Sequence, residues 1–193
     1  MNEELFMLDS SESDGPAEIV MDYIISYTLR SANNIKFPLL AEYARKILFR
    51  LIETIDSGQT ISRIEVWKQW GEAKKRMDLT VEIDIIDSDG AVSNHAILIE
   101  DKYYSGIRYD DNLQEYQIQT YKRIFDNFYG DKTIHKHYWV ISCISPSDEK
   151  FDRLYSFVRD YNFKAISIYD LVKGINQDCE SDIFNQFFLR DWC

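Results

Sequence analysis

The chain has 193 residues, 45% of them hydrophobic and 15% aromatic, and a formal net charge of -11. With only 7 glycines and 3 prolines, this composition predicts one globular domain over residues 1–193 and leaves little room for linkers. No apolar run approaches the length that crosses a bilayer, and the first residues are acidic where a secretory signal is basic. Three widely spaced cysteines argue against a disulfide framework or a cysteine-based zinc site and indicate a reducing compartment, so we expect a soluble, cytoplasmic protein without a membrane partner.

The negative charge is unfavourable for nucleic-acid binding, because phosphates need positive potential. The charge is unevenly distributed, however. Residues 1–22 carry seven acids and no base, and we expect residues 1–15 to form an acidic flexible arm. The rest of the chain has 22 bases against 26 acids, and residues 63–76 have five bases against two acids. The charge is therefore a warning against nucleic acid but does not exclude it.

Two helices are expected in the first 58 residues. Pro16 suits the first turn of a helix that runs to about Arg30. A second helix begins at Pro38, because apolar residues recur from there at helical spacing. The sequence Asp56-Ser57-Gly58 is typical of the end of such a helix.

The hydrophobic period then changes to that of strands. Residues 61–70 are rich in β-branched and aromatic side chains, and residues 77–86 alternate between apolar and polar side chains. A third strand is expected at 94–104. Between them, Ser88-Asp89-Gly90 suits a three-residue hairpin loop, since glycine accepts the left-handed backbone that such a loop needs. These segments predict an antiparallel meander of three strands.

The second half of the chain alternates helices and strands. We expect a helix at 111–128, a strand buried on both faces at 138–144, a helix that Ser147 caps, and a short strand at 164–168. C-terminal helices with an aromatic cluster follow (Phe184, Phe187, Phe188 and Trp192). The predicted fold class is α/β, with a mixed central sheet flanked by helices and extra helices at both termini.

The predicted hairpin brings charged residues together. If the loop is 88–90, Asp87 faces Ala91, and the same antiparallel register places Asp78 opposite Glu100. Lys102 lies two residues past Glu100 and therefore points to the same face of the strand. The sequence thus predicts two carboxylates and one ammonium group at one edge of a sheet.

Such a cluster has two interpretations. Two facing carboxylates repel each other unless a hard divalent cation lies between them, and Mg²⁺ or Mn²⁺ with oxygen ligands suits phosphodiester hydrolysis. A lysine beside the cation can position the attacking water and stabilise charge on the phosphate. Alternatively, Lys102 neutralises Asp78 and Glu100 in a structural ion cluster that holds no metal.

These residues also match a known pattern. Residues 76–79, the acidic hairpin loop and residues 97–104, which include Glu100-Asp101-Lys102, resemble the D…(D/E)-x-K signature of the PD-(D/E)xK, or restriction-endonuclease-like, superfamily. Four further segments resemble elements of this superfamily. Residues 18–29 resemble the first helix of one branch, and residues 117–121 resemble the helix after the lysine. Residues 138–141 resemble the fourth strand, and residues 166–171 resemble a late strand-to-helix step. Met77 departs from the family's proline. The resemblance spans about residues 17–190.

The resemblance implies a restriction-endonuclease-like αβββαβ core and a Mg²⁺-dependent (or Mn²⁺-dependent) phosphodiesterase, either an endonuclease or an exonuclease. The ligands that it implies for the metal are the following: Asp78, Glu100, Asp101 through its main-chain carbonyl, and Glu18 through a second metal or a water. Lys102 would serve the attacking water. An acid such as Glu18 also suits the start of a helix for dipole reasons alone.

The resemblance further implies a functional glutamine on the helix after the lysine. Both Gln117 and Gln114 match the motif, and Gln117 is preferred because it shares the apolar stripe that faces the sheet. Gln117 would hold the cluster or contact phosphate. The alternative is an ordinary helix residue that forms hydrogen bonds in the core.

Two other groups are candidates for binding. Lys74, Lys75 and Arg76 precede Asp78 and would bind the nucleic-acid backbone, although a solvated turn explains them slightly better. His135 and His137 lie on one face of a strand start, where a solvated strand edge is favoured over a zinc site because no acid or cysteine pair is near.

The sequence therefore favours a nuclease that acts on nucleic acid, DNA rather than RNA. A homodimer is left open, because many members of the superfamily cut as dimers. Two rival hypotheses remain. The first is a nuclease-fold domain that binds nucleic acid without catalysis. The second is an acidic protein-interaction module with a structural ion cluster, which would show no salt-dependent DNA binding.

Overall fold

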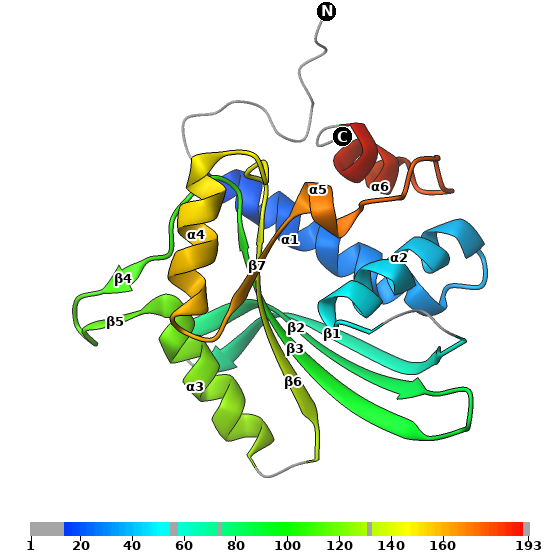
Figure 1. Ribbon diagram of the computed structural model, residues 1–193, viewed down its shortest axis with the longest axis horizontal. Coiled ribbons are helices and arrows are strands. Elements are labelled where there is room, and N and C mark those ends of the chain that lie inside the picture. Colours follow the sequence, from blue (N-terminus) through cyan, green and yellow to red (C-terminus); the bar gives the residue numbers. More distant parts are fainter. Residues whose placement is uncertain (1–13, 55–57, 73–74, 131–132, 191–193) are drawn as a thin grey trace, which may run out of the picture.

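The protein is an α/β domain built on a five-stranded mixed sheet, with strand order β1-β2-β3-β6-β7 (Figure 1). The structure is a computed structural model that describes residues 14–54, 58–72, 75–130 and 133–190, with side chains from residue 17 onward and none described for residue 72. β1, β2 and β3 are antiparallel, whereas β6 and β7 are parallel to β3. The predicted mixed sheet flanked by helices is confirmed.

The elements follow the predicted order. Before the sheet come α1 (Asp14–Arg30), the 3-10 turn η1 (Ser31–Asn33) and α2 (Pro38–Leu51). The antiparallel half of the sheet consists of β1 (Thr60–Glu72), β2 (Lys75–Ile86) and β3 (Val92–Lys102). Then come β4 (Tyr109–Asp110), β5 (Glu115–Tyr116), α3 (Gln117–Tyr129), β6 (His135–Ser142), α4 (Glu149–Arg159) and β7 (Lys164–Ser167). The chain continues through α5 (Ile168–Leu171), α6 (Asp182–Phe184) and the π-helical segment η2 (Asn185–Arg190). No helix in the described ranges is long and apolar enough to span a bilayer.

The predicted hairpin register between β2 and β3 is confirmed over most of its length. Leu79 pairs with Ile99 and Ile86 with Val92, and every intermediate pair keeps the same offset. The loop closes where the sequence places it, because Asp87 N–H donates to the carbonyl of Ala91 and Gly90 has φ +85°. The strictly alternating side chains of β2 explain this, because a slip by one residue would expose its apolar face.

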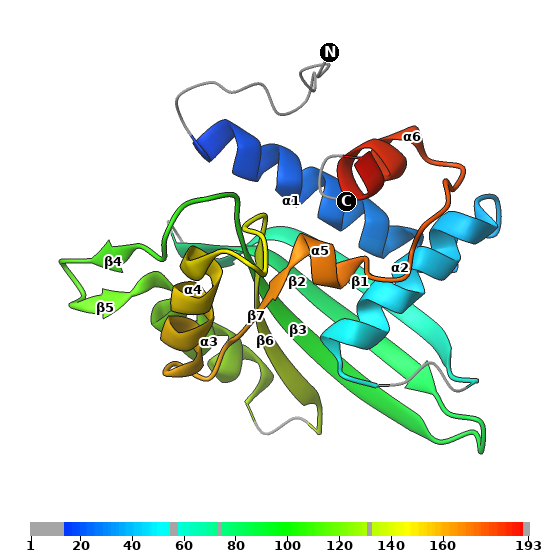
Figure 2. The same cartoon turned by 45° about the horizontal axis from the view of Figure 1, so that its top comes forward.

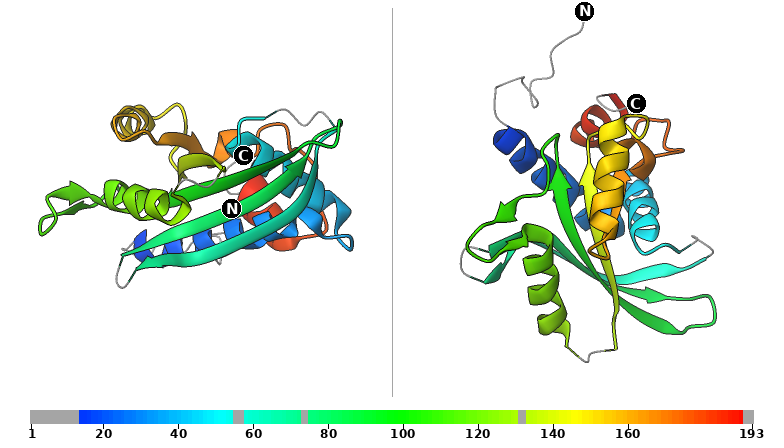
Figure 3. Two further views of the ribbon diagram at one scale, coloured as in Figure 1. Left: turned by 90° about the horizontal axis from the view of Figure 1, so that it is seen from below. Right: turned by 60° about the vertical axis from the view of Figure 1, so that its left-hand side comes forward.

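Each face of the sheet has its own core. The apolar residues of β2 with odd numbers, from Leu79 to Ile85, pack against α1, α2 and the C-terminal helices. On the other face, Ala96, Leu98 and Val140 pack against α3 and α4. Figure 2 shows α1, α2 and α6 together on one side of the sheet, and Figure 3 shows how strongly the sheet twists between the two layers.

The predicted helix at 111–128 is wrong at its start. The helix α3 begins at Gln117, and β4 and β5 form a small hairpin before it that projects away from the sheet (Figure 1). Asp110 accepts hydrogen bonds from the backbone N–H groups of Asn112 and Leu113, and Gln114 adopts φ +54°. This local turn satisfies the backbone where we expected helical hydrogen bonds.

Consequently the predicted apolar stripe of this helix also differs. Leu113 lies in the turn and is 40% exposed. Tyr121, a member of the predicted stripe, is buried, and α3 also buries Ile118, Thr120, Phe125 and Tyr129. Gln117 stands at the first position of the helix and is half-buried.

Several boundaries shift by a few residues. Asp148 rather than Ser147 caps α4, since its carboxylate accepts from the backbone N–H of Lys150 at 2.8 Å. The second helix ends at Leu51, and the expected stop at Asp56 and Ser57 lies outside the described residues. The expected aromatic cluster is present in part, because Phe184, Phe187 and Phe188 are buried. Its fourth member, Trp192, and the acidic arm up to residue 13 also lie outside the described residues.

All three histidines of the chain meet at the far end of β3 and β6. His95 Nδ1 and His137 Nε2 are 3.0 Å apart, and the His95 and His135 ring centroids are 5.0 Å apart. Burial and then the charge of His95 lower the pKa of His137 to about 4. His137 is therefore a neutral hydrogen-bonding residue of the sheet at neutral pH.

This histidine pair predicts a pH-dependent stability. An unfolded histidine titrates near 6.5, so the unfolded chain takes up a proton before folded His137 does as the pH falls. Between pH 6.5 and about 4, His137 therefore lowers the free energy of unfolding. We expect His137→Gln to flatten the loss of stability over this window in urea denaturation, with the exposed His135→Gln as control. Parallel pH curves for wild type and His137→Gln would show that the explanation is wrong.

Candidate active site

The site forms where the regular alternation of β2 breaks at Asp78. Leu79 packs in the core beside α1 and α2, but Met77 packs in the core beside α3 and α4. Two residues apart on a regular strand would share a face, so the backbone changes direction between them. Opposite this point on β1, Gln69 adopts φ +52°. Asp78 is thereby placed at the junction of the two faces, beyond the last regular pair of β2 with β3.

Asp78 contacts the end of β3 through a hydrogen bond. Its Oδ2 atom accepts from the backbone N–H of Asp101 at 3.2 Å. The pairing of Asp78 with Glu100 lies one step beyond the last pair of β2 and β3 and stays a prediction, although the Asp78 charge acts on the Glu100 carboxyl. The carboxylates remain neighbours, as the hairpin register predicts.

Glu100 and Lys102 form a buried ion pair at this end of β3. Lys102 Nζ lies 2.7 Å from Glu100 Oε1, and Glu100 is 1% exposed. Apart from this ion pair, both carboxylate oxygens of Glu100 are buried without a hydrogen-bond partner among the described residues. Burial alone would lower the pKa of Lys102, but the charges of Glu100, Asp78 and Glu18 outweigh it and raise that pKa. Lys102 is therefore a charged ammonium group, on the same side as Glu100.

A second group of acids meets at Asp78. Asp22 of α1 and Asp101 of β3 each bring a carboxylate oxygen near Asp78, and the three oxygens lie within 4.8 Å of one another. Gln69 Nε2 donates to Asp22 Oδ2 at 3.4 Å. Asp22 Oδ1 and Asp101 Oδ2 are buried without a hydrogen-bond partner among the residues that the structure describes. We call Asp22, Asp78 and Asp101 the acidic trio.

Burial makes the charged form of these acids unfavourable. It raises the pKa of Asp22 to about 7, with a further contribution from the charge of Asp78. Burial and then Asp78 also raise the pKa values of Glu100 and Asp101 well above the ordinary range for carboxyls. A cluster that is so poorly compensated calls for a positive partner.

The donor set of the trio fits a hard divalent cation. Carboxylate oxygens are the ligands that Mg²⁺ and Mn²⁺ prefer, and buried oxygens without partners are free to bind one. Lys102 forms an ion pair with Glu100, whereas the charges of Lys68 and Lys102 act on Asp22 and Asp78 without an ion pair to the trio among the described residues. The buried acids can therefore hold a metal ion.

Glu18 lies on the other side of Lys102. Its Oε2 atom is 3.8 Å from Lys102 Nζ, and its Oε1 atom accepts hydrogen bonds from Tyr103 N at 3.3 Å and from the hydroxyl of Ser105. It is outside the acidic trio, so its role as a metal ligand stays a prediction. In this structure Glu18 connects α1 to the end of β3.

The other predicted site residues are placed as follows. Gln117 Nε2 donates to the Tyr121 hydroxyl at 2.8 Å, and the charge of Glu100 contributes to raising the pKa of that tyrosine to about 12, after burial. Gln114 lies in the exposed turn between β4 and β5. Lys75 and Arg76 lie at the start of β2, and Lys74 lies outside the described residues. A nucleic-acid contact by these bases stays a prediction.

Sequence reasoning missed Asp22 and Gln69 as members of the site. Asp22 lies one turn after Glu18 in α1 and next to the fully buried Met21, so a carboxylate on the buried face of an apolar helix was the available signal. Gln69 gave no signal, because its left-handed backbone depends on the strand pairing around Asp78.

The fold and the site together define an α/β domain with a buried acidic centre at the edge of a mixed sheet. No protein-family model matches the chain, and no curated protein sequence matches it. A comparison with solved structures finds the MspJI restriction endonuclease in complex with a 27-mer oligonucleotide, at 12% sequence identity and a TM-score of 0.26. The match covers 86% of this chain and 32% of that chain, so this protein spans about a third of the length of MspJI. A TM-score this low does not establish a shared activity.

The uncompensated acids predict a trade-off between stability and metal binding. We expect Asp101→Asn to raise the free energy of unfolding in EDTA by about 1 kcal/mol, because it removes a carboxyl group whose charged form is unfavourable when buried. The same variant should lose most of the stabilisation that Mn²⁺ gives the wild type in thermal melts. Asp111→Asn, an exposed acid outside the site, is the matched control. A destabilised variant that keeps the full Mn²⁺ shift would contradict the assignment.

Proposed function

We propose that this protein is a metal-dependent nuclease with a restriction-endonuclease-like fold, which hydrolyses phosphodiester bonds in DNA. The main evidence for the proposal is that the Lys102–Glu100 ion pair and the acidic trio lie next to each other at the end of β3. The order of helices and strands around this point supports membership of the PD-(D/E)xK superfamily, as does the sequence Glu100-Asp101-Lys102 itself.

Two pairs of acids are available for the cation. The pairs are Asp78 with Glu100, whose pKa the Asp78 charge raises, and Asp78 with Asp101, whose backbone N–H donates a hydrogen bond to Asp78. In this proposal Asp78 and Asp101 hold Mg²⁺ or Mn²⁺, with Asp22 or Glu100 as a further ligand. When bound, the cation supplies Lewis-acid chemistry at the phosphate and favours ionisation of the attacking water.

The residues of the chain supply the remaining chemistry. Lys102 is held by Glu100 and Glu18, so its ammonium group is fixed beside the acids. There it positions the water and stabilises the negative charge that develops on the phosphate. Gln117 and Tyr121 contact each other beside Glu100 and Lys102, where they restrain the cluster. Lys75 and Arg76 provide positive charge close to Asp78 for the DNA backbone.

The proposal predicts that Lys102 is essential. We expect Lys102→Met to lower the cleavage rate of plasmid DNA in Mg²⁺ or Mn²⁺ by about 100-fold or more, because a preorganised charge at the phosphate is lost. Lys46→Met is the matched control, since Lys46 lies on the surface of α2, where it contacts Glu42 and the Tyr43 ring and is outside the site. EDTA should abolish the cleavage by the wild type.

Asp78→Asn tests the same site while keeping the buried ammonium group of Lys102, and it should also lose cleavage. Circular dichroism shows whether each variant is folded. Wild-type activity in both folded variants would refute the proposed mechanism.

If the wild type binds DNA but never cuts it, the chain is a non-catalytic DNA-binding domain. If it neither binds Mn²⁺ nor shows salt-dependent DNA binding, the acidic interaction module is the better explanation.

A further inference from the structure

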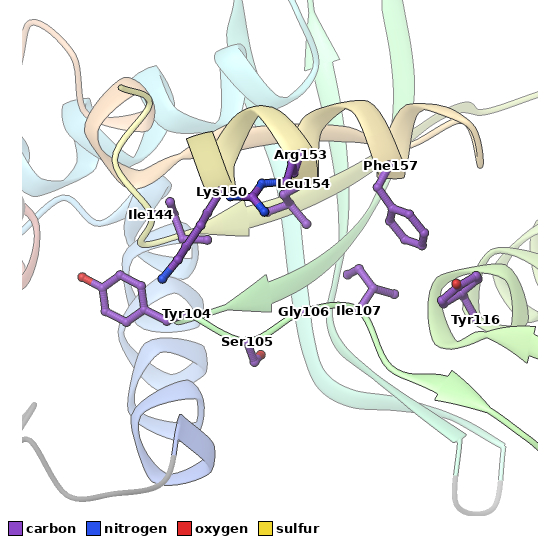
Figure 4. Close-up of a pocket in the computed structure, with 10 residues that line it drawn as sticks. All are labelled: Tyr104, Ser105, Gly106, Ile107, Tyr116, Ile144, Lys150, Arg153, Leu154 and Phe157. Carbon is purple, nitrogen blue, oxygen red and sulfur yellow. The ribbon is translucent and has the colours of Figure 1, made fainter. Parts of the chain in front are cut away.

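A pocket opens beside the candidate active site, between the segment after β3 and helix α4 (Figure 4). Its volume is about 430 Å³, within the range typical of sites for small organic ligands. One wall is the segment 104–107, and the opposite wall is the face of α4 that carries Lys150, Arg153 and Phe157. None of the residues used in the proposed cleavage chemistry lines this pocket.

The two ends of the pocket differ in chemistry. In Figure 4, Lys150 extends from α4 toward Tyr104 at one end, with Arg153 beside it. Tyr116, Phe157 and Ile107 form the other end. Tyr116 and Phe157 already stack edge to face, with ring centroids 4.8 Å apart, so this apolar end is preformed.

The charge of the pocket is opposite to that of the protein. No acidic residue is among the described residues that line it, whereas the chain as a whole carries -11. Lys150 forms no ion pair with another described residue, and the interactions of Arg153 are an exposed ion pair with Glu149 at 3.8 Å and a hydrogen bond from Nε to the Glu149 carbonyl at 3.4 Å. Two cations that remain available at one end select an anionic ligand.

The pocket is directly connected to the acidic site. Ser105 lines the pocket and also donates its hydroxyl to Glu18, which contacts Lys102. Tyr104 follows Lys102 by two residues, so their Cα atoms are no more than about 7 Å apart. A strand that places one phosphate at Lys102 therefore brings a neighbouring nucleotide to the pocket.

We propose that this pocket binds an unpaired nucleotide of the substrate strand, with its phosphate at Lys150 and Arg153 and its base against Tyr116 and Phe157. The inference rests on the proposed nuclease function and specifies its substrate. Base stacking on aromatic rings requires a base that is free of its duplex neighbours. The enzyme would therefore act on single-stranded DNA or on unpaired ends and flaps rather than within an intact duplex.

Binding in EDTA tests this inference separately from cleavage. The probe is a short fluorescein-labelled oligodeoxythymidylate, compared with a blunt duplex of the same length by fluorescence anisotropy. We expect the full-length protein to prefer the single strand, and Lys150→Glu to weaken that binding about tenfold. Lys150→Arg should retain it. Lys36→Glu, on the exposed connection before α2, makes the same change in net charge and should have little effect.

Each outcome separates the two proposals. Equal loss in Lys150→Glu and Lys36→Glu, or no loss in either, overturns the pocket assignment. Equal binding of single strand and duplex overturns it as well, because an unpaired base would then not be recognised. If Lys150→Glu alone loses binding while the wild type cleaves no DNA in Mg²⁺ or Mn²⁺, the pocket assignment stands and the nuclease proposal fails.

Discussion

Burial of carboxylates beside one ammonium group is the constraint on which the functional account of this protein depends. Glu100, Asp101 and Lys102 are consecutive at the end of β3, and each is 5% exposed or less. Lys102 compensates Glu100 but leaves oxygens of Asp22 and Asp101 without partners among the described residues. A purely structural cluster would gain stability by replacing one of these acids, since an unpaired buried charge is strongly unfavourable. The arrangement is better explained as a site that is completed by a cation.

The fold creates this constraint through three elements that meet at one point. The β2–β3 hairpin brings Asp78 to Asp101, and helix α1 lies across the end of β3, where Asp22 and Glu18 contact the two sides of the cluster. The change of face at Asp78 directs its side chain toward both groups of acids. Beyond the cluster, the chain after β3 forms the wall of a basic and aromatic pocket, so the acidic site and the proposed nucleotide pocket are adjacent in the sequence as well as in space.

Much of this arrangement could be predicted from the sequence, because it depends on local patterns. The alternation in β2 and the loop at 88–90 fix the hairpin register, and that register brings Asp78, Glu100 and Lys102 to one edge of the sheet. The part that could not be predicted depends on tertiary packing. The left-handed backbone of Gln69 depends on the strand pairing around Asp78, and the inward side chain of Asp22 depends on how α1 packs on the sheet. The β4–β5 hairpin replaces a turn of helix that propensity alone favoured.

The central claim is that the buried acids at the end of β3 hold a divalent cation next to Lys102. Anomalous X-ray diffraction from a crystal soaked in Mn²⁺ tests it most directly, because the signal locates the ion without reference to any activity. The account predicts one strong peak within coordination distance, about 2 to 2.3 Å, of carboxylate oxygens from Asp78 and Asp101. A crystal with no peak there, at a Mn²⁺ concentration that fills surface sites elsewhere, would contradict it.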